Sequence, residues 1–563
     1  MFEKTQIFPL IGLHRTSIKA RLPLNMTRIS LYLISILTLF FTACQKETQV
    51  EKANREKILL VGNGGDPKSL DLHLVTGVIE SKVIGSLFEG LVGDHPQSDT
   101  EMPSAAAVSW EHNADYTEWV FQLRQGAKWS DGELVTAHDF VFAYNRMLHP
   151  ELAAPYVEML YFIKNAEAYN KGEIIDFAKV GVKAEGDYTL RIQLKEPVPY
   201  LPGVTRHYTW FPVPKHIVLQ HGKISDRFTE WTDVGNIVGN GAFVLQSWKM
   251  NDHVAVKKNP HYWDVENVKL NGVRFFPTEN TYTETRAFLA GQLHVTYQLP
   301  PDLVPKMEKE YPQFLRKDPY VGSRFVRVNV TRPALNDPRV RMALSLSLDR
   351  KSLCDTVLQG FAPADTLSPD LGAYQPESVV AYDLEKARAL LAEAGYPNGK
   401  GFPRYSILIG SGGTRSTSEA IQAMWKKNLN ILFDIHAMDY GSYISAQQKL
   451  DFDVTLAGWI GDYLDPTTFL LMWTEGNGNN NTGWHSDDFE KLLDDAAHSA
   501  DPAERLKLFV QAEKLLMEEQ PIIPFAWQAK TYLLQPQVKN WQPLLLDNHP
   551  WSAVELNSEK EAP

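Results

Sequence analysis

The chain has 563 residues, 44% of them hydrophobic, and its 56 Lys and Arg against 68 Asp and Glu give a formal net charge of −12. An acidic chain without runs of Lys and Arg cannot neutralise many phosphates, which argues against nucleic acid as a partner. The length suffices for two or three domains with large cores.

The first 43 residues carry the features of an export signal. After Arg28 comes an uncharged run, residues 29–43, which is shorter than the roughly 20 residues that span a bilayer and ends directly before Cys44. This pattern predicts a signal peptide over residues 1–43 and lipid attachment at Cys44, with an ordinary export signal as the alternative. Met26 also begins a conventional signal peptide, so residues 1–25 would then belong to an over-long start. Lipidation of Cys44 would leave Cys354 without an intrachain partner, and so exclude a disulfide framework or a cysteine metal site.

The segment 44–57 is rich in charge and poor in apolar residues, which predicts a flexible tether. Strands and helices then alternate along the body, which indicates an α/β fold with mixed sheets covered by helices. We expect strands at 58–61, 119–123 and 191–194, and helices at 80–91 and 136–147. The second helix is expected to begin with a capping box formed by Thr136 and Asp139.

The most informative segment is residues 458–467 (GWIGDYLDPT), which follows an apolar alternating strand predicted at 452–457. It places Asp462 beside Trp459 and Tyr463, and a carboxylate among rings and backbone amides suits a small cation such as an amino terminus. The sequence has no His-Glu-x-x-His and no Gly-x-Ser-x-Gly, and Asp465 before Pro466 is interpreted as a turn or helix-start residue. We therefore expect a binding protein, not an enzyme, with a secreted hydrolase as a remote alternative.

Seven further segments and this decapeptide occur in the same order in a known family, the periplasmic oligopeptide-binding proteins that serve peptide ABC importers. The resemblance covers about residues 59–546. The segments are DPKSLD at 66–71, LFEGL at 87–91, KWSDG at 128–132, NGAF at 240–243, NPHYW at 259–263, DPRVRMAL at 337–344 and AEAGY at 392–396.

The resemblance implies a two-lobed, three-domain periplasmic binding protein fold of the α/β class, with mixed sheets and a hinge. Domain I would comprise residues 58–93, 226–320 and 526–563. Domain II would comprise 94–225, and domain III 321–525. Hinge closure around a ligand is a common motion of such proteins.

The resemblance also implies roles for individual residues. Asp462 would pair with the amino terminus of the peptide, and Trp459 would line the pocket. A ligand bound as an added strand would use backbone groups, which explains tolerance of side-chain sequence. The remaining residues expected to contact the peptide are Gly458, Ile460, Thr76, Gly77, Val78 and Tyr156.

The sequence departs from the family where the carboxylate end of the peptide would bind. Leu456 and Thr414 stand where basic side chains are expected, and the segment around Gln359 and Gly360 has no lysine. Arg415 is the remaining candidate for that contact. These features suggest a ligand with a free amine and a modified or long carboxyl end, of which murein-derived peptides are one class.

Taken together, the residues and the resemblance predict a monomeric extracytoplasmic receptor, in the periplasm or cell envelope, held to the membrane by a lipid on Cys44. Its partners would be short peptides and the permease of an ABC importer, with no cofactor and no metal. The alternative is the same fold with another cargo, such as a murein peptide, a metal chelate or haem.

Overall fold

The computed structural model describes residues 47–557, apart from 411–413, 439 and 500. From Gln49 onward these residues cluster into a single unit. The predicted signal peptide and Cys44 lie outside the described residues. Within the described part of the chain, no helix combines the length and the apolarity needed to cross a bilayer.

Three larger sheets organise the chain, and two of them mix parallel and antiparallel pairs, which confirms the predicted α/β class. The first sheet has the order β1 (Ile58–Gly62), β8 (Gly272–Phe276), β7 (His253–Lys258) and β6 (Phe243–Lys249). The second, fully antiparallel, has the order β2 (Ala107–His112), β3 (Glu118–Leu123), β5 (Thr189–Gln193) and β4 (Val182–Ala184). The third has the order β10 (Ala362–Pro363), β14 (Ile522–Leu533), β9 (Leu315–Val328), β13 (Val454–Ile460), β11 (Tyr405–Gly410) and β12 (Phe433–Met438). A small pair joins β15 (Val538–Lys539) to β16 (Glu555–Leu556).

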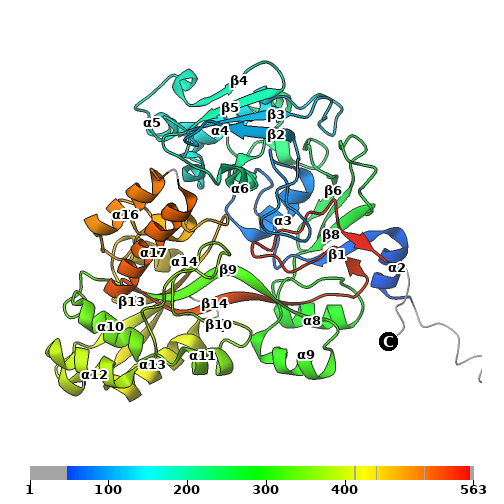
Figure 1. Cartoon of the computed structure of the whole chain (residues 1–563). Helices are drawn as coiled ribbons and strands as arrows, with labels where there is room; N and C mark the ends of the chain where they lie inside the picture. Colours follow the sequence, from blue (N-terminus) through cyan, green and yellow to red (C-terminus); the bar gives the residue numbers. More distant parts are fainter. Residues whose placement is uncertain (1–46, 411–413, 439, 500, 558–563) are drawn as a thin grey trace, which may run out of the picture. The chain divides into compact units, whose positions relative to one another are not determined.

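Helices fill the connections between these strands (Figure 1). Beside the first sheet lie α2 (Gln49–Glu56), α3 (Val78–Leu87), α8 (Thr281–Leu289) and α9 (Val304–Glu310). Between the strands of the second sheet, and after it, come α4 (Ala137–Leu148), α5 (Ala166–Asn170), α6 (Leu201–Val204) and α7 (Lys215–His221). The third sheet is accompanied by α10 (Pro338–Leu346), α11 (Arg350–Thr356), α12 (Leu384–Glu393), α13 (Arg415–Leu429), α14 (Tyr440–Gln448), α15 (Thr467–Leu470), α16 (Asp487–Ala497) and α17 (Pro502–Glu519).

Local sequence signals placed several of these elements correctly. The start of α4 has the predicted capping box, with the Thr136 N–H donating to Asp139 Oδ2 at 2.9 Å. The predicted helix at 80–91 is α3, but it ends at Leu87, earlier than expected. The cause is a distant side chain, because the Asn240 amide bonds to both the N–H and the carbonyl of Glu89 and holds that residue outside the helix.

Two predictions about segment boundaries are wrong. Part of the expected tether, Gln49–Glu56, is helix α2, and its Val50 and Ala53 are buried against Leu60 of β1. The strand predicted at 452–457 is β13, which continues through Ile460, so three residues of the decapeptide belong to the sheet. Their partner strand, β9, is more than 100 residues away in the sequence, so the local pattern does not reveal that these three residues are paired.

The two longest strands, β9 and β14, pair over ten residue positions in the third sheet, from Leu315↔Leu533 to Arg327↔Ile522. In Figure 1 they run together from the region of α8 and α9 into the part of the molecule that holds α10 and α13. The expected domain boundaries at 320/321 and 525/526 fall inside these two strands. We retain the three domains as a proposal in which β9 and β14 form the hinge, with β-bulges in β14 near Pro524 and Trp527.

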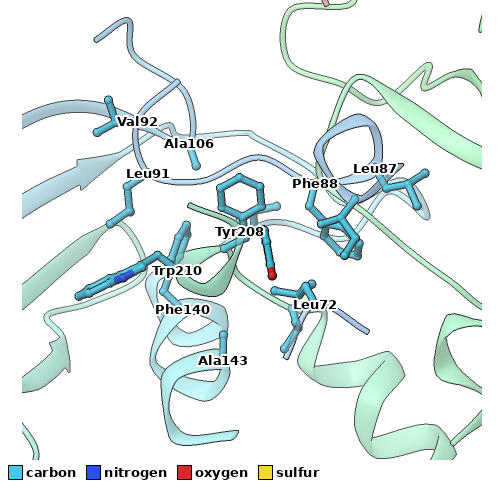
Figure 2. Close-up of a cluster of buried hydrophobic side chains, with 14 of the residues drawn as sticks. Leu72, Leu87, Phe88, Leu91, Val92, Ala106, Phe140, Ala143, Tyr208 and Trp210 are labelled. Carbon is cyan, nitrogen blue, oxygen red and sulfur yellow. The ribbon is translucent and has the colours of Figure 1, made fainter. Parts of the chain in front are cut away.

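A continuous hydrophobic core lies behind the candidate site. It joins residues of α3, α4 and the segment around Trp210, as Figure 2 shows for Phe88, Phe140 and Tyr208. The Tyr208 hydroxyl, 3.0 Å from the Val75 carbonyl, links this core to the segment that precedes α3. The core thus holds in place several residues whose other side faces a cavity.

Candidate functional site

A cavity of about 710 Å³ brings together segments from all three expected domains. Residues Thr76, Gly77 and Val78, where α3 begins, form part of one wall. Tyr156 comes from the region after α4, and residues 458–462 come from the end of β13. Eight of the nine residues that the sequence nominated for ligand contact therefore line one cavity, namely Thr76, Gly77, Val78, Tyr156, Gly458, Trp459, Ile460 and Asp462.

Asp462 is a partly buried carboxylate at the end of β13 with few partners. Its Oδ1 accepts a hydrogen bond of 2.8 Å from the Tyr156 hydroxyl, and its N–H donates to Thr468 Oγ1 at 3.0 Å. Burial raises the pKa of Asp462 to about 6, an effect that the Tyr156 hydrogen bond opposes and the negative charge of Glu158 increases. No Lys, Arg or His among the described residues forms an ion pair with it, so the carboxylate can still accept a cation.

The outer edge of β13 is open where it borders the cavity. The Gly461 N–H donates to the Val321 carbonyl at 2.7 Å, and in an antiparallel ladder every second residue bonds to the same neighbour. The backbone groups of Gly458 and Ile460 therefore point away from β9. On that side β11 pairs only with Val454 and Thr455, and no described residue bonds to the backbone of Gly458 or Ile460.

Gly458 and Trp459 have distinct structural roles at this edge. A Cβ on Gly458 would lie 2.8 Å from Arg324 Cδ and 2.9 Å from the Ser323 carbonyl, so no side chain fits there. The Trp459 indole N–H is buried without a hydrogen-bond partner among the described residues. An unpaired buried donor beside a cavity is costly unless a ligand or water accepts from it.

The opposite wall is the start of α3. Gly77 is its N-cap, and a Cβ there would lie 2.2 Å from Glu80 Oε2. The Glu80 side chain is itself held by the Lys68 N–H, which donates to Oε1 at 2.9 Å. The absence of a side chain at Gly77 thus leaves room for the Glu80 carboxylate beside the cavity wall.

Several other charged groups of the cavity are already paired. The Nζ atoms of Lys82 and Lys530 each lie 3.2 Å from Asp547 Oδ2. Burial by itself would raise the pKa of Asp547, but the two lysines outweigh it and hold that pKa well below its usual range. Arg206 Nε donates to Asp94 Oδ1 at 2.7 Å.

A second buried carboxylate, Glu89, also lines the cavity, and burial raises its pKa to about 7. The Tyr262 hydroxyl and the Trp263 indole N–H donate to it at 2.8 and 2.7 Å and oppose the shift. Because both of its oxygens are bonded to the protein, Glu89 is a structural group.

One nominated residue lies elsewhere. Arg415 is exposed at the start of α13, where it pairs with Glu419 at 3.0 Å, and it does not line the cavity. Helical spacing alone did not reveal that this turn of α13 faces solvent. Leu456 and Thr414 stand where basic side chains were expected. Leu456 is buried in the core, and Thr414 is the N-cap of α13.

Asp465 has the structural role expected of it. Its two oxygens accept hydrogen bonds of 2.7 and 2.8 Å from Arg505, and Oδ1 also accepts from the Thr467 N–H at 3.1 Å. The bidentate pair and the turn leave no free oxygen for catalysis.

Sequence reasoning missed three cavity residues on the third sheet, namely Tyr320, Arg324 and Gln528. A local signal was present, because Arg324 lies between apolar residues such as Val321 and Phe325 in the second half of β9. A charged residue within such a strand indicates a polar surface on one face.

Comparisons with known proteins show which family the chain resembles. The model of the bacterial extracellular solute-binding proteins, family 5, matches residues 101–481. The chain is 34% identical over 536 residues to the periplasmic oligopeptide-binding protein OppA of Salmonella typhimurium, covering 91% of this chain and 96% of the relative. It is 33% identical to the periplasmic murein peptide-binding protein MppA of Escherichia coli, covering 84% and 88%. The structure of Haemophilus influenzae OppA in complex with RPPGFSPFR superposes with a TM-score of 0.76 at 32% identity, covering 89% of this chain and 99% of that one.

Proposed function

The chain belongs to the bacterial extracellular solute-binding proteins of family 5, and from that membership we propose that it binds short peptides in the cavity and delivers them to the permease of an ABC importer. The family is one of substrate-binding proteins, and we extend this to the chain by proposing that it has no catalytic role. The relatives are named as periplasmic peptide-binding proteins, which supports the same class of ligand here.

The observation that carries the proposal is the open edge of β13 next to an unpaired carboxylate. The outward backbone groups of Gly458 and Ile460 match what an extended peptide offers, because main-chain hydrogen bonds are independent of side-chain identity. Asp462, at the end of the same edge, supplies a counter-ion for an amino terminus. Hydrogen bonds along a strand combined with one charge pair select peptides with a free amine.

Tyr156 supports this role for Asp462. Its hydroxyl donates a hydrogen bond of 2.8 Å to Asp462 Oδ1 and so orients the carboxylate. An ammonium in contact with a partly buried carboxylate favours the charged form of both groups. The peptide would therefore lie between β13 and the wall formed by Thr76, Gly77 and Val78.

We also propose that the protein works outside the cytoplasm as a monomer attached to the membrane by a lipid on Cys44. The extracytoplasmic location accords with the names of the relatives. A lipid on Cys44 would keep the receptor close to the permease. Metabolic labelling with a fatty acid, compared between the full chain and Cys44→Ser, tests the anchor.

The experiment for the proposed function is native mass spectrometry of protein purified under mild conditions, followed by denaturation and sequencing of released molecules. We expect a set of short peptides with free amino termini, and we expect calorimetry to detect binding of an alanine tripeptide added to ligand-free protein. The recovered tripeptide should be chemically unchanged. A metal chelate, haem or sugar in the released fraction, together with no binding of tripeptides, would contradict the proposal, and hydrolysed tripeptide would revive the hydrolase alternative.

A further inference from the structure

Arg324 is a cation of the cavity without a counter-ion. Three Lys or Arg side chains line the cavity, and Lys82 and Arg206 are paired with Asp547 and Asp94. The guanidinium of Arg324 makes no hydrogen bond or ion pair with any described residue. It is partly buried, so water compensates its charge less well than at the surface.

The sheet is shaped to hold this side chain against the cavity. Tyr320, Gly322 and Arg324 alternate along β9 and so share one face. The two cross-strand partners of Arg324 are both small, Gly458 of β13 and Ala526 of β14. Arg324 lies over its partner Gly458, with Nη1 3.2 Å from the position of a Cβ there. The glycine thus provides the room for the guanidinium.

Gln528 occupies the neighbouring position in the same way. Its Nε2 lies 2.7 Å from the position that a Cβ on Gly322 would occupy, and its side-chain amide makes no hydrogen bond with any described residue. Arg324 and Gln528 therefore present N–H donors side by side on one face of the sheet, which we call the Arg324–Gln528 floor. Two adjacent donors, one of them charged, match the two oxygens of a carboxylate.

The electrostatics support an anionic partner. Burial lowers the pKa of Arg324, and only the tyrosines Tyr443 and Tyr320 act against this. No ion pair joins Arg324 to Asp462 or to any other acid of the described residues, so the protein itself does not neutralise the guanidinium. The cavity therefore has an unpaired acid at one point and an unpaired base at another.

We propose that Arg324, together with Gln528, binds the α-carboxylate of a short peptide whose amino group is bound by Asp462. This inference rests on the proposed function and adds a limit on ligand length. Gly458, beneath the guanidinium, and Asp462 are four residues apart, and at about 3.3 Å per residue their backbones are separated by roughly 13 Å at most. An extended peptide covers that separation with about three to four residues.

The test compares alanine tripeptide with its C-terminal amide on the full-length protein, by calorimetry at neutral pH. For the unaltered protein we expect the amide to bind about 10- to 100-fold more weakly, because it lacks the charge that Arg324 would meet. In Arg324→Gln the free peptide should lose affinity to the same degree while the amide keeps its own, so the two bind within about threefold of each other. Retained binding of the amide also shows that the variant is folded.

Arg415→Gln is the matched control, since Arg415 is an exposed arginine outside the cavity. It should leave the preference for the free peptide unchanged. If the preference disappears in Arg415→Gln and persists in Arg324→Gln, the inference is wrong.

Two further ligand series locate the carboxylate. The ratio of free to amidated affinity should be largest for three or four alanines, compared with two, five or six. The amide of Ala-Glu-Ala tests an acidic side chain as the source. If Arg324→Gln weakens binding of the Ala-Glu-Ala amide but changes the affinities of the free and the amidated alanine tripeptide equally, the assignment to the α-carboxylate is overturned.

Two other outcomes separate this inference from the proposed function. Equal binding of both tripeptides to the unaltered protein would overturn the role of Arg324 but would leave peptide binding standing. Failure of either tripeptide to bind would count against the proposed function itself.

Discussion

Asp462 carries its charge in surroundings that favour the neutral form. Burial raises its pKa to about 6, and its only side-chain partner in the described part of the chain is the Tyr156 hydroxyl. A carboxylate in this state gains more from an added cation than a solvated one does, because the ion pair replaces hydration that burial has already removed. The same feature makes its charge depend on pH in an accessible range.

We predict that peptide affinity falls on acidification through pH 6. Below its raised pKa the Asp462 carboxylate takes up a proton and cannot pair with the ammonium, so affinity at pH 5 should be about tenfold lower than at pH 7.5. Above about pH 8 affinity should fall again as the peptide α-amino group loses its proton. Calorimetric titration of an alanine tripeptide between pH 4.5 and 9 measures both limbs.

Asp462→Asn removes the acidic limb. It should weaken binding at pH 7.5 by about two orders of magnitude, since loss of one partner of a buried pair costs about 3–5 kcal/mol. Asp451→Asn, an exposed acid before the same strand, is the control and should bind normally. A loss below about threefold in Asp462→Asn, or an unchanged acidic limb, would exclude Asp462 as the amine ligand.

At the scale of elements, helix α2 belongs to the folded body. Val50 and Ala53 are buried against Leu60, and the Val50 N–H donates to the Gly291 carbonyl at 2.9 Å. The helix therefore covers apolar side chains of β1, whose outer edge is hydrogen-bonded to the segment at residues 294–295. None of its residues lines the cavity.

This packing predicts that Val50→Asp destabilises the protein by about 2–3 kcal/mol, because it places an unpaired charge in an apolar contact. Urea unfolding measures the change, and peptide affinity should stay within about twofold. Lys52→Asp, an exposed position on the same helix, should change stability by less than about 0.5 kcal/mol. Equal stability of the two variants would mean that the segment behaves as the tether that its composition suggested.

At the scale of the whole body from Gln49 onward, a set of contacts joins the expected domains II and III beside the cavity. Tyr200 stacks on Tyr463 with ring centroids 5.7 Å apart, and the Arg505 guanidinium lies 4.7 Å from the Tyr200 ring. Tyr156 and Asp462 add the hydrogen bond already described. A ligand between the domains can shift the equilibrium between separated and joined domains only if it binds the two arrangements with different affinity. The contacts that form only in the joined arrangement therefore influence the apparent affinity for the ligand.

Tyr200→Ala is therefore expected to favour separated domains. Loss of the stacked pair and the cation–π contact removes about 1–2 kcal/mol, so apparent peptide affinity should fall by about 5- to 30-fold. Small-angle X-ray scattering of ligand-free protein should show a larger radius of gyration, which saturating peptide partly restores. Tyr382→Ala, an exposed tyrosine, is the control. An unchanged radius and affinity in Tyr200→Ala would show that these contacts do not control the balance.

Features that depend on near neighbours in the chain were predictable from the sequence. Three local patterns predicted features that the structure contains. They are the capping box of Thr136 and Asp139 at the start of α4, the strand β1, and the position of Asp462 just after the strand β13. The ordered segments that indicated the family are likewise short. They were enough to predict the fold class and to nominate nine residues for ligand contact, eight of which line the cavity.

Contacts between groups that are far apart in the sequence became visible only in the folded structure. Arg324 borders the cavity because β9 pairs with β13 in a register that sets it over Gly458, and Arg415 does not because its turn of α13 faces solvent. Likewise α3 ends early through a bond from Asn240, and α2 is ordered because β1 offers it an apolar surface. Register and burial arise from packing between distant segments, and the pattern within any single segment does not contain that information.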